Sequence, residues 1–295
     1  MNAFSLIWLK NIDPRRYALT RIGFALLLLS QFVHLFPYRD AIISDAGMNN
    51  SSAAKIGFHE LTGGTSISLF NYFQSSAEVT IILIFAIIAS LLLAWGKWAR
   101  ATLFICFFIQ LSLIHRAPAS TTGWDSILTN LGFILLFSPL GKEWNPWNLF
   151  RQWNQKQINL KAPQYGLVLI QLQVFIIYWQ TVLQKLGDQY WAKGESITYF
   201  LLSHHGRFIG SWPVNWHELF DKINYLILIV ELAIPILLWI RNTRKLGLWI
   251  GIGFHLSIAI LGINLALFSL TMVVSYLAFI DPWPTPSYKL RSSTK

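Results

Sequence analysis

Long apolar runs separated by short polar segments form the dominant pattern along this chain. Each run is close to the length that an α-helix needs to cross the hydrocarbon core of a bilayer. The pattern predicts about eight transmembrane helices; the run at 124–140 is shorter than the rest and is flanked by Gly and Pro. The other predicted spans are 17–37, 77–96, 98–115, 165–186, 222–240, 245–263 and 264–281. The predicted fold class is therefore all-α, a polytopic membrane helical bundle.

Composition supports this fold class and narrows the partners. Of 295 residues, 54% are hydrophobic and 12% are charged. The net charge of +10 is spread in short basic clusters between apolar runs, so it indicates membrane topology and we exclude nucleic acid as a partner. The single cysteine, Cys106, lies inside an apolar run and excludes a disulfide framework. We expect a retained N-terminus, one domain at 1–284 and a short cytoplasmic tail at 285–295.

The distribution of Lys and Arg predicts the orientation. With a cytoplasmic N-terminus, eight spans return the C-terminus to the same side, and only a minority of the 23 Lys and Arg then lie outside. Because basic residues are enriched on the cytoplasmic side, both termini are expected there. The predicted outer residues are Arg39, Lys55, Arg116, Lys185, Lys193, Arg207 and Lys222.

Two long segments, 38–76 and 187–221, lie on the predicted outer side, where the other connections are short. Both are rich in aromatic and polar residues, as in "YWAKGESITYF" and "FHELTGGTSISLFNYF". Long connections without a disordered composition are usually functional. We expect them to form interfacial helices that cover the outer side of the bundle.

Lys185 ends the predicted span 165–186 and has two interpretations. As an anchor, it extends its ammonium group to the headgroups. As a base, it lies on the polar face of its helix, which Gln173, Gln180 and Gln184 mark by spacings of seven and four. A desolvated lysine gives up its proton more easily than an exposed one, so the second interpretation predicts a catalytic residue.

Glu231 and His255 lie within apolar spans, where ionisable side chains are costly and face the protein interior. Glu231 is four residues before Pro235, so it either satisfies backbone groups freed by the proline, pairs with a cation, or relays protons. His255 follows Gly251 and Gly253, which predict the close approach of another helix. It either makes structural hydrogen bonds or transfers protons.

Asp125 and Arg116 flank a short outer connection. Asp125 is in the first turn of its predicted helix, where the helix N-terminus favours a carboxylate. Arg116 ends the preceding span. The two side chains either pair with each other or bind an anionic or carbonyl-bearing substrate.

Several kinds of site lack their sequence pattern. No His-x-x-x-His or Cys-x-x-Cys spacing indicates a metal site, and "LTGGTS" alone does not make a phosphate-binding loop. No Gly-x-Ser-x-Gly element indicates a nucleophilic serine. We therefore expect no bound metal, and the cofactor remains open.

The order of elements resembles the HTTM superfamily, the membrane domain shared with vitamin K-dependent gamma-carboxylases. The resemblance extends over nearly the whole chain. It is carried by "DPRRYALTRIGFALLLL", "HRAPASTTGWDSILTNLGFILLFSP", "YWQTVLQKLGDQYWAKGESITYF", "ELAIPILLW" and "GFHLSIAILGINLALFSLTMVVSYLAF".

The resemblance implies roles for particular residues. Lys185, with Trp191 six positions later, matches the lysine that activates reduced vitamin K in the carboxylases. His255 resembles a histidine near the active region of that family. Asp125 stands where the animal carboxylases have a histidine, and "TGWD" resembles the Gly-Gly-Asp of bacterial members.

These observations predict a quinol-linked modifying enzyme with Lys185, His255 and Asp125 as catalytic residues. Arg116, Trp191, Glu231 and Gln180 are the predicted substrate-binding residues; the cofactor stays open, with a reduced quinone as the candidate. One alternative is an accessory protein that helps to mature a secreted peptide, because bacterial members of the superfamily include a protein needed to mature a peptide toxin. A transporter is a further alternative, but the ionisable residues gather at one side and trace no path across the membrane.

The predicted orientation can be tested by cysteine labelling in intact cells. In a Cys106→Ala background, a membrane-impermeant thiol reagent should label Ser203→Cys, which is predicted to lie outside, and should leave Gln155→Cys unlabelled until the membrane is permeabilised. Labelling of Gln155→Cys but not Ser203→Cys in intact cells would invert the topology.

Overall fold

The computed structural model describes residues 8–155 and 160–282 and is almost entirely helical in these ranges. The elements follow the apolar runs. The long helices are α2 (Arg15–Leu35), α5 (Ser76–Trp95), α6 (Ala99–Arg116), α9 (Tyr165–Leu186), α12 (His217–Trp239) and α13 (Arg244–Leu261), with shorter α7 (Gly123–Leu136) and α14 (Ala266–Ser275). The short helices are α3 (Arg39–Ile42), α4 (Ser51–Thr62), α8 (Pro146–Arg151), α10 (Gln189–Lys193) and α11 (Ser196–Leu202). The remaining elements are strands β1 (Asn11–Ile12) and β2 (Ala162–Pro163) and 3-10 turns η1 (Phe36–Tyr38), η2 (Leu69–Asn71), η3 (Pro118–Ser120), η4 (Val214–Trp216) and η5 (Tyr276–Phe279).

The all-α fold class is confirmed in the described ranges. Six helices there are long and apolar enough to cross a membrane, namely α5, α6, α9, α12, α13 and the continuous segment Arg15–Ile42. The other two predicted spans form shorter apolar helices, Gly123–Leu136 and Ala266–Phe279. The span expected at 124–140 ends early because the chain turns at Phe137 and continues into Pro139. The predicted boundary between domain and tail, at 284 and 285, lies outside the described residues.

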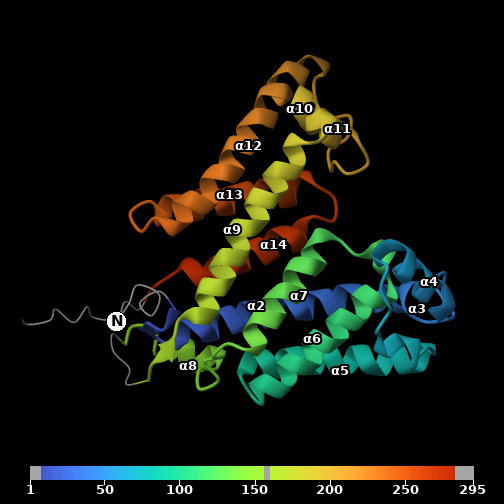
Figure 1. Ribbon diagram of the computed structural model, residues 1–295, viewed down its shortest axis with the longest axis vertical. Coiled ribbons are helices and arrows are strands. Elements are labelled where there is room, and N and C mark those ends of the chain that lie inside the picture. The colour runs from blue at the N-terminus through green and yellow to red at the C-terminus, as the bar shows by residue number, and fades with distance from the viewer. Residues whose placement is uncertain (1–7, 156–159, 283–295) are drawn as a thin grey trace, which may run out of the picture.

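The helices pack in two groups, which Figure 1 shows as a lower bundle and an upper part. In the lower bundle, α2 packs along α5, α5 along α6 and α6 along α7, around a core that includes Phe24, Leu83, Leu103 and Leu128. In the upper part, α12 packs against both α9 and α13, and α14 packs against α13. A second, smaller core joins these helices. Helix α14 also packs against α2 and α7, so it connects the two groups.

The connections between helices gather at two ends. At one end, β1 pairs with β2 in antiparallel register, and Arg16 donates to the carbonyl of Ala278. At the other end, Asn49 bonds to the carbonyl of Arg116, and Gly206 forms an antiparallel bridge with Gly262. Segments that the sequence places on the same side of the membrane therefore meet in the structure.

Arg21 holds the first of these ends together, although it lies within an apolar helix. Its side chain is fully buried and donates to the carbonyls of Gly141, Ala94 and Trp144, the last at 2.6 Å. Gly96 makes this possible, because it ends α5 at φ +85° and because a Cβ there would lie 2.5 Å from a guanidinium nitrogen of Arg21. One charge thus joins three segments of the chain.

Removal of this contact should destabilise the protein. Arg21→Met keeps the apolar stem but leaves buried carbonyls without donors, so we expect a loss of about 2–4 kcal/mol. The midpoint of thermal unfolding in detergent, followed by size-exclusion chromatography, measures the loss. Arg241→Met is the matched control at an exposed arginine of the same end, and it should stay within about 0.5 kcal/mol of wild type. Equal unfolding midpoints for the two variants would contradict the proposed role of Arg21 as a clamp that joins three segments of the chain.

Candidate functional site

Lys185 and Glu231 form an ion pair between α9 and α12. The ammonium nitrogen lies 2.6 Å from each carboxylate oxygen, and the side chains are 18% and 6% exposed. Glu231 therefore pairs with a cation, which was one of the three interpretations that its sequence left open. Because the carboxylate is buried, it depends on Lys185 for compensation, whereas the lysine keeps some access to the outside.

Trp191 covers this pair. Its ring centroid is 4.4 Å from the Lys185 ammonium, a cation–π distance. Asp188 caps α10 by accepting from the backbone of Tyr190 and Trp191, and this cap sets the position of the indole. Asn224, two turns before Glu231 on α12, donates to the carbonyl of Trp191. The structure thus brings together Lys185, Glu231 and Trp191, which the sequence had proposed separately.

His255 belongs to a second buried cluster. Its Nε2 lies 2.8 Å from the hydroxyl of Tyr178, which also bonds to the hydroxyl of Tyr276. Gly251 allows this contact, because a Cβ there would lie 2.7 Å from the Tyr276 hydroxyl. Gly253 has open space beside it, so the predicted close approach holds for Gly251 only. The Nδ1 atom of His255 is buried and has no hydrogen-bond partner in the described part of the chain.

The two clusters lie along one face of α9. Tyr178 is seven residues before Lys185, which places it two turns deeper, about 10 Å along the helix axis. Our sequence analysis missed both tyrosines. The seven-residue spacing from Lys185 was the available signal for Tyr178, whereas Tyr276 joins the site only through tertiary packing.

Asp125 lies apart from these clusters, in the lower bundle. Its Oδ1 accepts from Gln31 and Gln110, and its Oδ2 accepts from the backbone and hydroxyl of Thr122. It occupies the first turn of α7, as the sequence predicted, and it links α2, α6 and α7. These four hydrogen bonds account for the burial of the carboxylate without any substrate.

Arg116 pairs with Asp45, so the predicted alternative in which it pairs with Asp125 is wrong. The guanidinium is fully buried and donates to Asp45 at 2.6 Å and to the carbonyls of Ile43 and Asn49. Burial alone would raise the pKa of Asp45, but hydrogen bonds from Arg116 and Ser51 outweigh burial and lower it. We therefore assign Arg116 a structural role, in which it fixes segment 43–49 to the end of α6.

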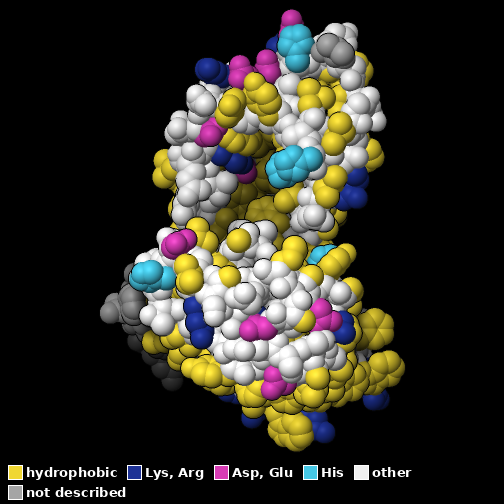
Figure 2. Space-filling model, turned by 90° about the vertical axis from the view of Figure 1, so that its right-hand side faces the viewer, with side chains coloured by type: hydrophobic (Ala, Val, Ile, Leu, Met, Phe, Trp, Pro, Cys, Tyr) yellow, Lys and Arg dark blue, Asp and Glu magenta, His cyan; other side chains and the backbone are white. Residues whose placement is uncertain are grey.

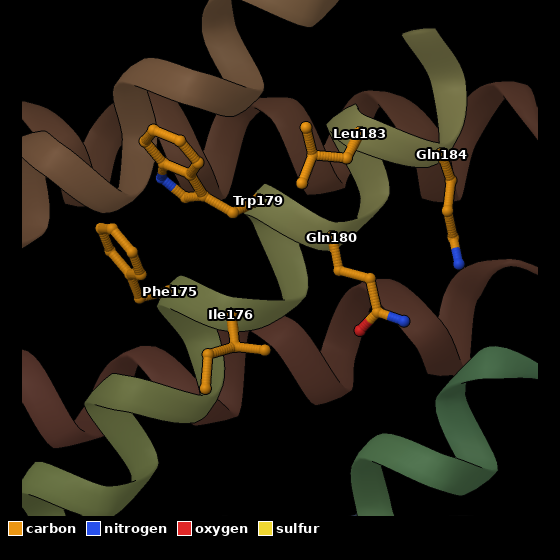
Figure 3. A pocket seen from close by; sticks show the side chains of 6 residues that line it. All are labelled: Phe175, Ile176, Trp179, Gln180, Leu183 and Gln184. Carbon is orange, nitrogen blue, oxygen red and sulfur yellow. The ribbon is translucent and has the colours of Figure 1, made fainter. Parts of the chain in front are cut away.

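Gln180 lies on an open groove along α9, near Lys185. The groove has a volume of about 620 Å³ and is lined by Phe175, Ile176, Trp179, Gln180, Leu183 and Gln184. Figure 3 shows the aromatic rings on one side of the helix and the two amides on the other. Gln173, on the same predicted stripe, instead donates to the carbonyl of Ile127.

The surface is also hollowed between the two parts of the molecule. Figure 2 shows the hollow below the tip that α10, α11 and α12 form, with hydrophobic side chains at its floor and acidic and basic side chains on its wall. Within residues 8–155 and 160–282, no three His, Cys, Asp or Glu side chains gather as metal ligands.

Comparison with known proteins gives two matches. The family model of the HTTM domain matches residues 9–283. The sporulation-delaying protein SdpB of Bacillus subtilis (strain 168) is 26% identical over 293 aligned residues, which cover 92% of this chain and 85% of that protein. No solved structure matches significantly.

The energetics of the ion pair can be tested by removing its charges one at a time. Lys185→Met leaves the Glu231 carboxylate buried and unpaired, so we expect a loss of about 3–5 kcal/mol. Glu231→Leu should cost less, because Lys185 can extend its ammonium group outward. The double variant should be more stable than Lys185→Met alone, as judged by thermal midpoints in detergent. Additive losses in the double variant would exclude a coupled pair.

Proposed function

This chain belongs to the HTTM domain family, and we propose that it is an integral membrane enzyme in which Lys185 exchanges a proton with a lipid-soluble quinol-class substrate. The observation that carries the proposal is the pairing of Lys185 with Glu231 beneath Trp191, at the end of a helix whose outer face forms a groove. A substrate dissolved in the bilayer can reach such a groove from the side.

The ion pair supplies a route to a neutral lysine. Transfer of the ammonium proton to a carboxylate oxygen, 2.6 Å away, produces an uncharged amine and a carboxylic acid. The amine can then accept a proton from a weakly acidic hydroxyl group, and Trp191 stabilises the ammonium that results.

The groove suits a reduced quinone. Phe175 and Trp179 offer aromatic surface on one side of α9, and Gln180 and Gln184 offer amide groups on the other, so the lining supplies contacts for a ring and for its oxygens on separate sides of the helix. When bound, a reduced quinone would supply reducing electrons to the modification. In this proposal the chain itself orients the ring, excludes water with Leu183 and the aromatic side chains, and holds the proton at Lys185.

The deeper cluster supports a further role for His255. The bonded series from Tyr178 to Tyr276 and His255 lies near Glu231, and hydroxyl and imidazole groups can both accept and donate protons. We propose that His255 exchanges protons with this cluster, while Asp125 serves the scaffold of the lower bundle.

A second function is the maturation of a secreted peptide, with this protein as an accessory. The similarity to a sporulation-delaying protein over most of both chains favours it. The aromatic segments between Phe36 and Ser75 and between Gly187 and Trp216 would then offer the peptide a surface. Here Lys185 and Glu231 would join α9 to α12 without reacting.

The proposed setting is a bacterial inner membrane with eight crossings. The shorter α7 and the segment Ala266–Phe279 span about 21 Å each as helices, less than the ~30 Å hydrocarbon core. The polar residues on either side of these two helices would extend each crossing to the full thickness of the membrane, where they are buried between neighbouring helices. In this arrangement both termini are cytoplasmic, and α4, α10 and α11 lie at the outward-facing surface of the inner membrane.

Lys185→Arg tests the catalytic proposal. Arginine keeps the positive charge and can still pair with Glu231, but it cannot lose its proton near neutral pH. With dissolved dioxygen as the electron acceptor, we expect at least a ~100-fold loss in the rate at which the purified protein in liposomes catalyses the oxidation of a reduced naphthoquinone, followed by absorbance. Thermal stability should fall by less than about 2 kcal/mol, because the charge pair is retained.

Lys193→Arg is the matched control, since Lys193 is exposed at the end of α10 and has no part in the pair. It should oxidise the quinol at the wild-type rate. Retained oxidation in Lys185→Arg would remove the base. Absence of quinol oxidation in the wild type, with peptide maturation unaffected by Lys185→Arg in cells, would favour the accessory role.

A further inference from the structure

A second cavity lies at the end of the molecule where β1 pairs with β2, away from the ion pair of Lys185 and Glu231. It has a volume of about 330 Å³ and lies where the start of α2, the start of α6 and the segments around Leu140 and Ala162 meet. Its lining combines three cationic side chains with one carboxylate and several apolar residues. The lining residues are Pro14, Ala99, Arg100, Pro139, Leu140, Gly141, Lys142, Glu143, Leu160, Lys161 and Ala162.

The cationic side chains are available for a ligand. Lys142 and Lys161 form no hydrogen bond or ion pair with any described residue. Arg100 donates through Nη1 to the carbonyls of Leu135 and Leu136, so its guanidinium is fixed to the end of α7. Its Nε and Nη2 atoms have no acceptor in the described part of the chain. A guanidinium held in this way presents a planar donor pair of the kind that binds phosphate oxygens.

An apolar surface leads away from the same cavity. Phe137, next to the carbonyl that Arg100 contacts, is 65% exposed, and its ring packs edge to face on that of Phe133. Phe133 in turn contacts Phe107 on α6. This aromatic strip, defined by Phe137, Phe133 and Phe107, runs along the outer face of α6 and α7. Exposed rings on helices of this hydropathy face acyl chains.

From these observations we propose that this cavity binds the headgroup of an anionic glycerophospholipid. The phosphodiester group lies among Arg100, Lys142 and Lys161, and the acyl chains follow the aromatic strip. The excess of cations over the single carboxylate, Glu143, selects a net negative headgroup over a zwitterionic one. A free phosphate ion shares the headgroup chemistry, but it would make no use of the aromatic strip.

The site also matches its expected position in the bilayer. It lies at the end of the molecule where β1 pairs with β2 and where Arg21 clamps three segments. Trp98, which precedes α6, is 69% exposed and stacks with the ammonium of Lys97. Tryptophan and lysine side by side are typical of the membrane interface, where headgroups lie. The proposal is independent of the chemistry at Lys185.

Native mass spectrometry of the purified full chain, delipidated in detergent, tests the proposal. Titration with dioleoyl phosphatidylglycerol should give a bound lipid, with at least a ~10-fold preference over dioleoyl phosphatidylethanolamine. Lys142→Gln/Lys161→Gln should reduce phosphatidylglycerol affinity by about 10-fold or more while Arg100 keeps its structural contacts. Lys55→Gln/Lys193→Gln, at exposed lysines of the other end, should leave the affinity unchanged.

Two further arms identify the source of the phosphate. Phe137→Ala should weaken binding of the dioleoyl lipid more than that of a dihexanoyl lipid with the same headgroup. Inorganic phosphate in millimolar excess should not displace the long-chain lipid. Displacement by phosphate, equal binding of the zwitterionic lipid, or unchanged affinity in Lys142→Gln/Lys161→Gln would each overturn the proposal.

Discussion

A charge that enters the hydrocarbon region must find its partner within the protein, and the helices of this molecule are arranged around that requirement. Arg21 and Arg116 are fully buried, and each collects oxygen atoms from segments far apart in the sequence. Glu231 meets the same requirement through Lys185. The charged side chains thus act as the tertiary connectors, while the apolar side chains that lie between them provide surface for packing and for lipid.

These buried charged side chains differ in how many of their hydrogen-bonding groups are already occupied by the protein. The guanidinium of Arg116 donates through Nε and Nη2 to a carboxylate and two carbonyl oxygens, and its Nη1 is buried without a partner in the described part of the chain. Lys185 has one partner and some exposure, and it lies beside a groove. The number of partners that a charged side chain has within the protein therefore distinguishes a scaffold residue from a reactive candidate more clearly than its depth in the membrane does.

The sequence was sufficient to predict the helices because hydrophobicity and helix length act locally along the chain. It also identified Lys185, Glu231 and His255 as residues of interest, because an ionisable group in an apolar run is conspicuous, whereas Trp191 was proposed only through the family resemblance. It could not predict which of them meet, since a cationic side chain can donate to any oxygen atom that the fold brings within reach. One of the two alternatives paired Arg116 with Asp125, nine residues away, but the fold instead brings Asp45 to it. Tyr178 and Tyr276 were missed because tyrosine in an apolar helix gives no such signal.

The clamp at Arg21 has a consequence for biosynthesis. Its acceptors at Gly141 and Trp144 lie 120 and 123 residues later in the chain. At ~5–20 residues per second, a ribosome needs roughly 6–25 s to extend the chain that far. Helix α2 must therefore wait near the headgroups, or within the insertion machinery, until α7 and the segment that follows it have been made. Helix α2 is thus made before α5, α6 and α7 but reaches its final depth only together with them.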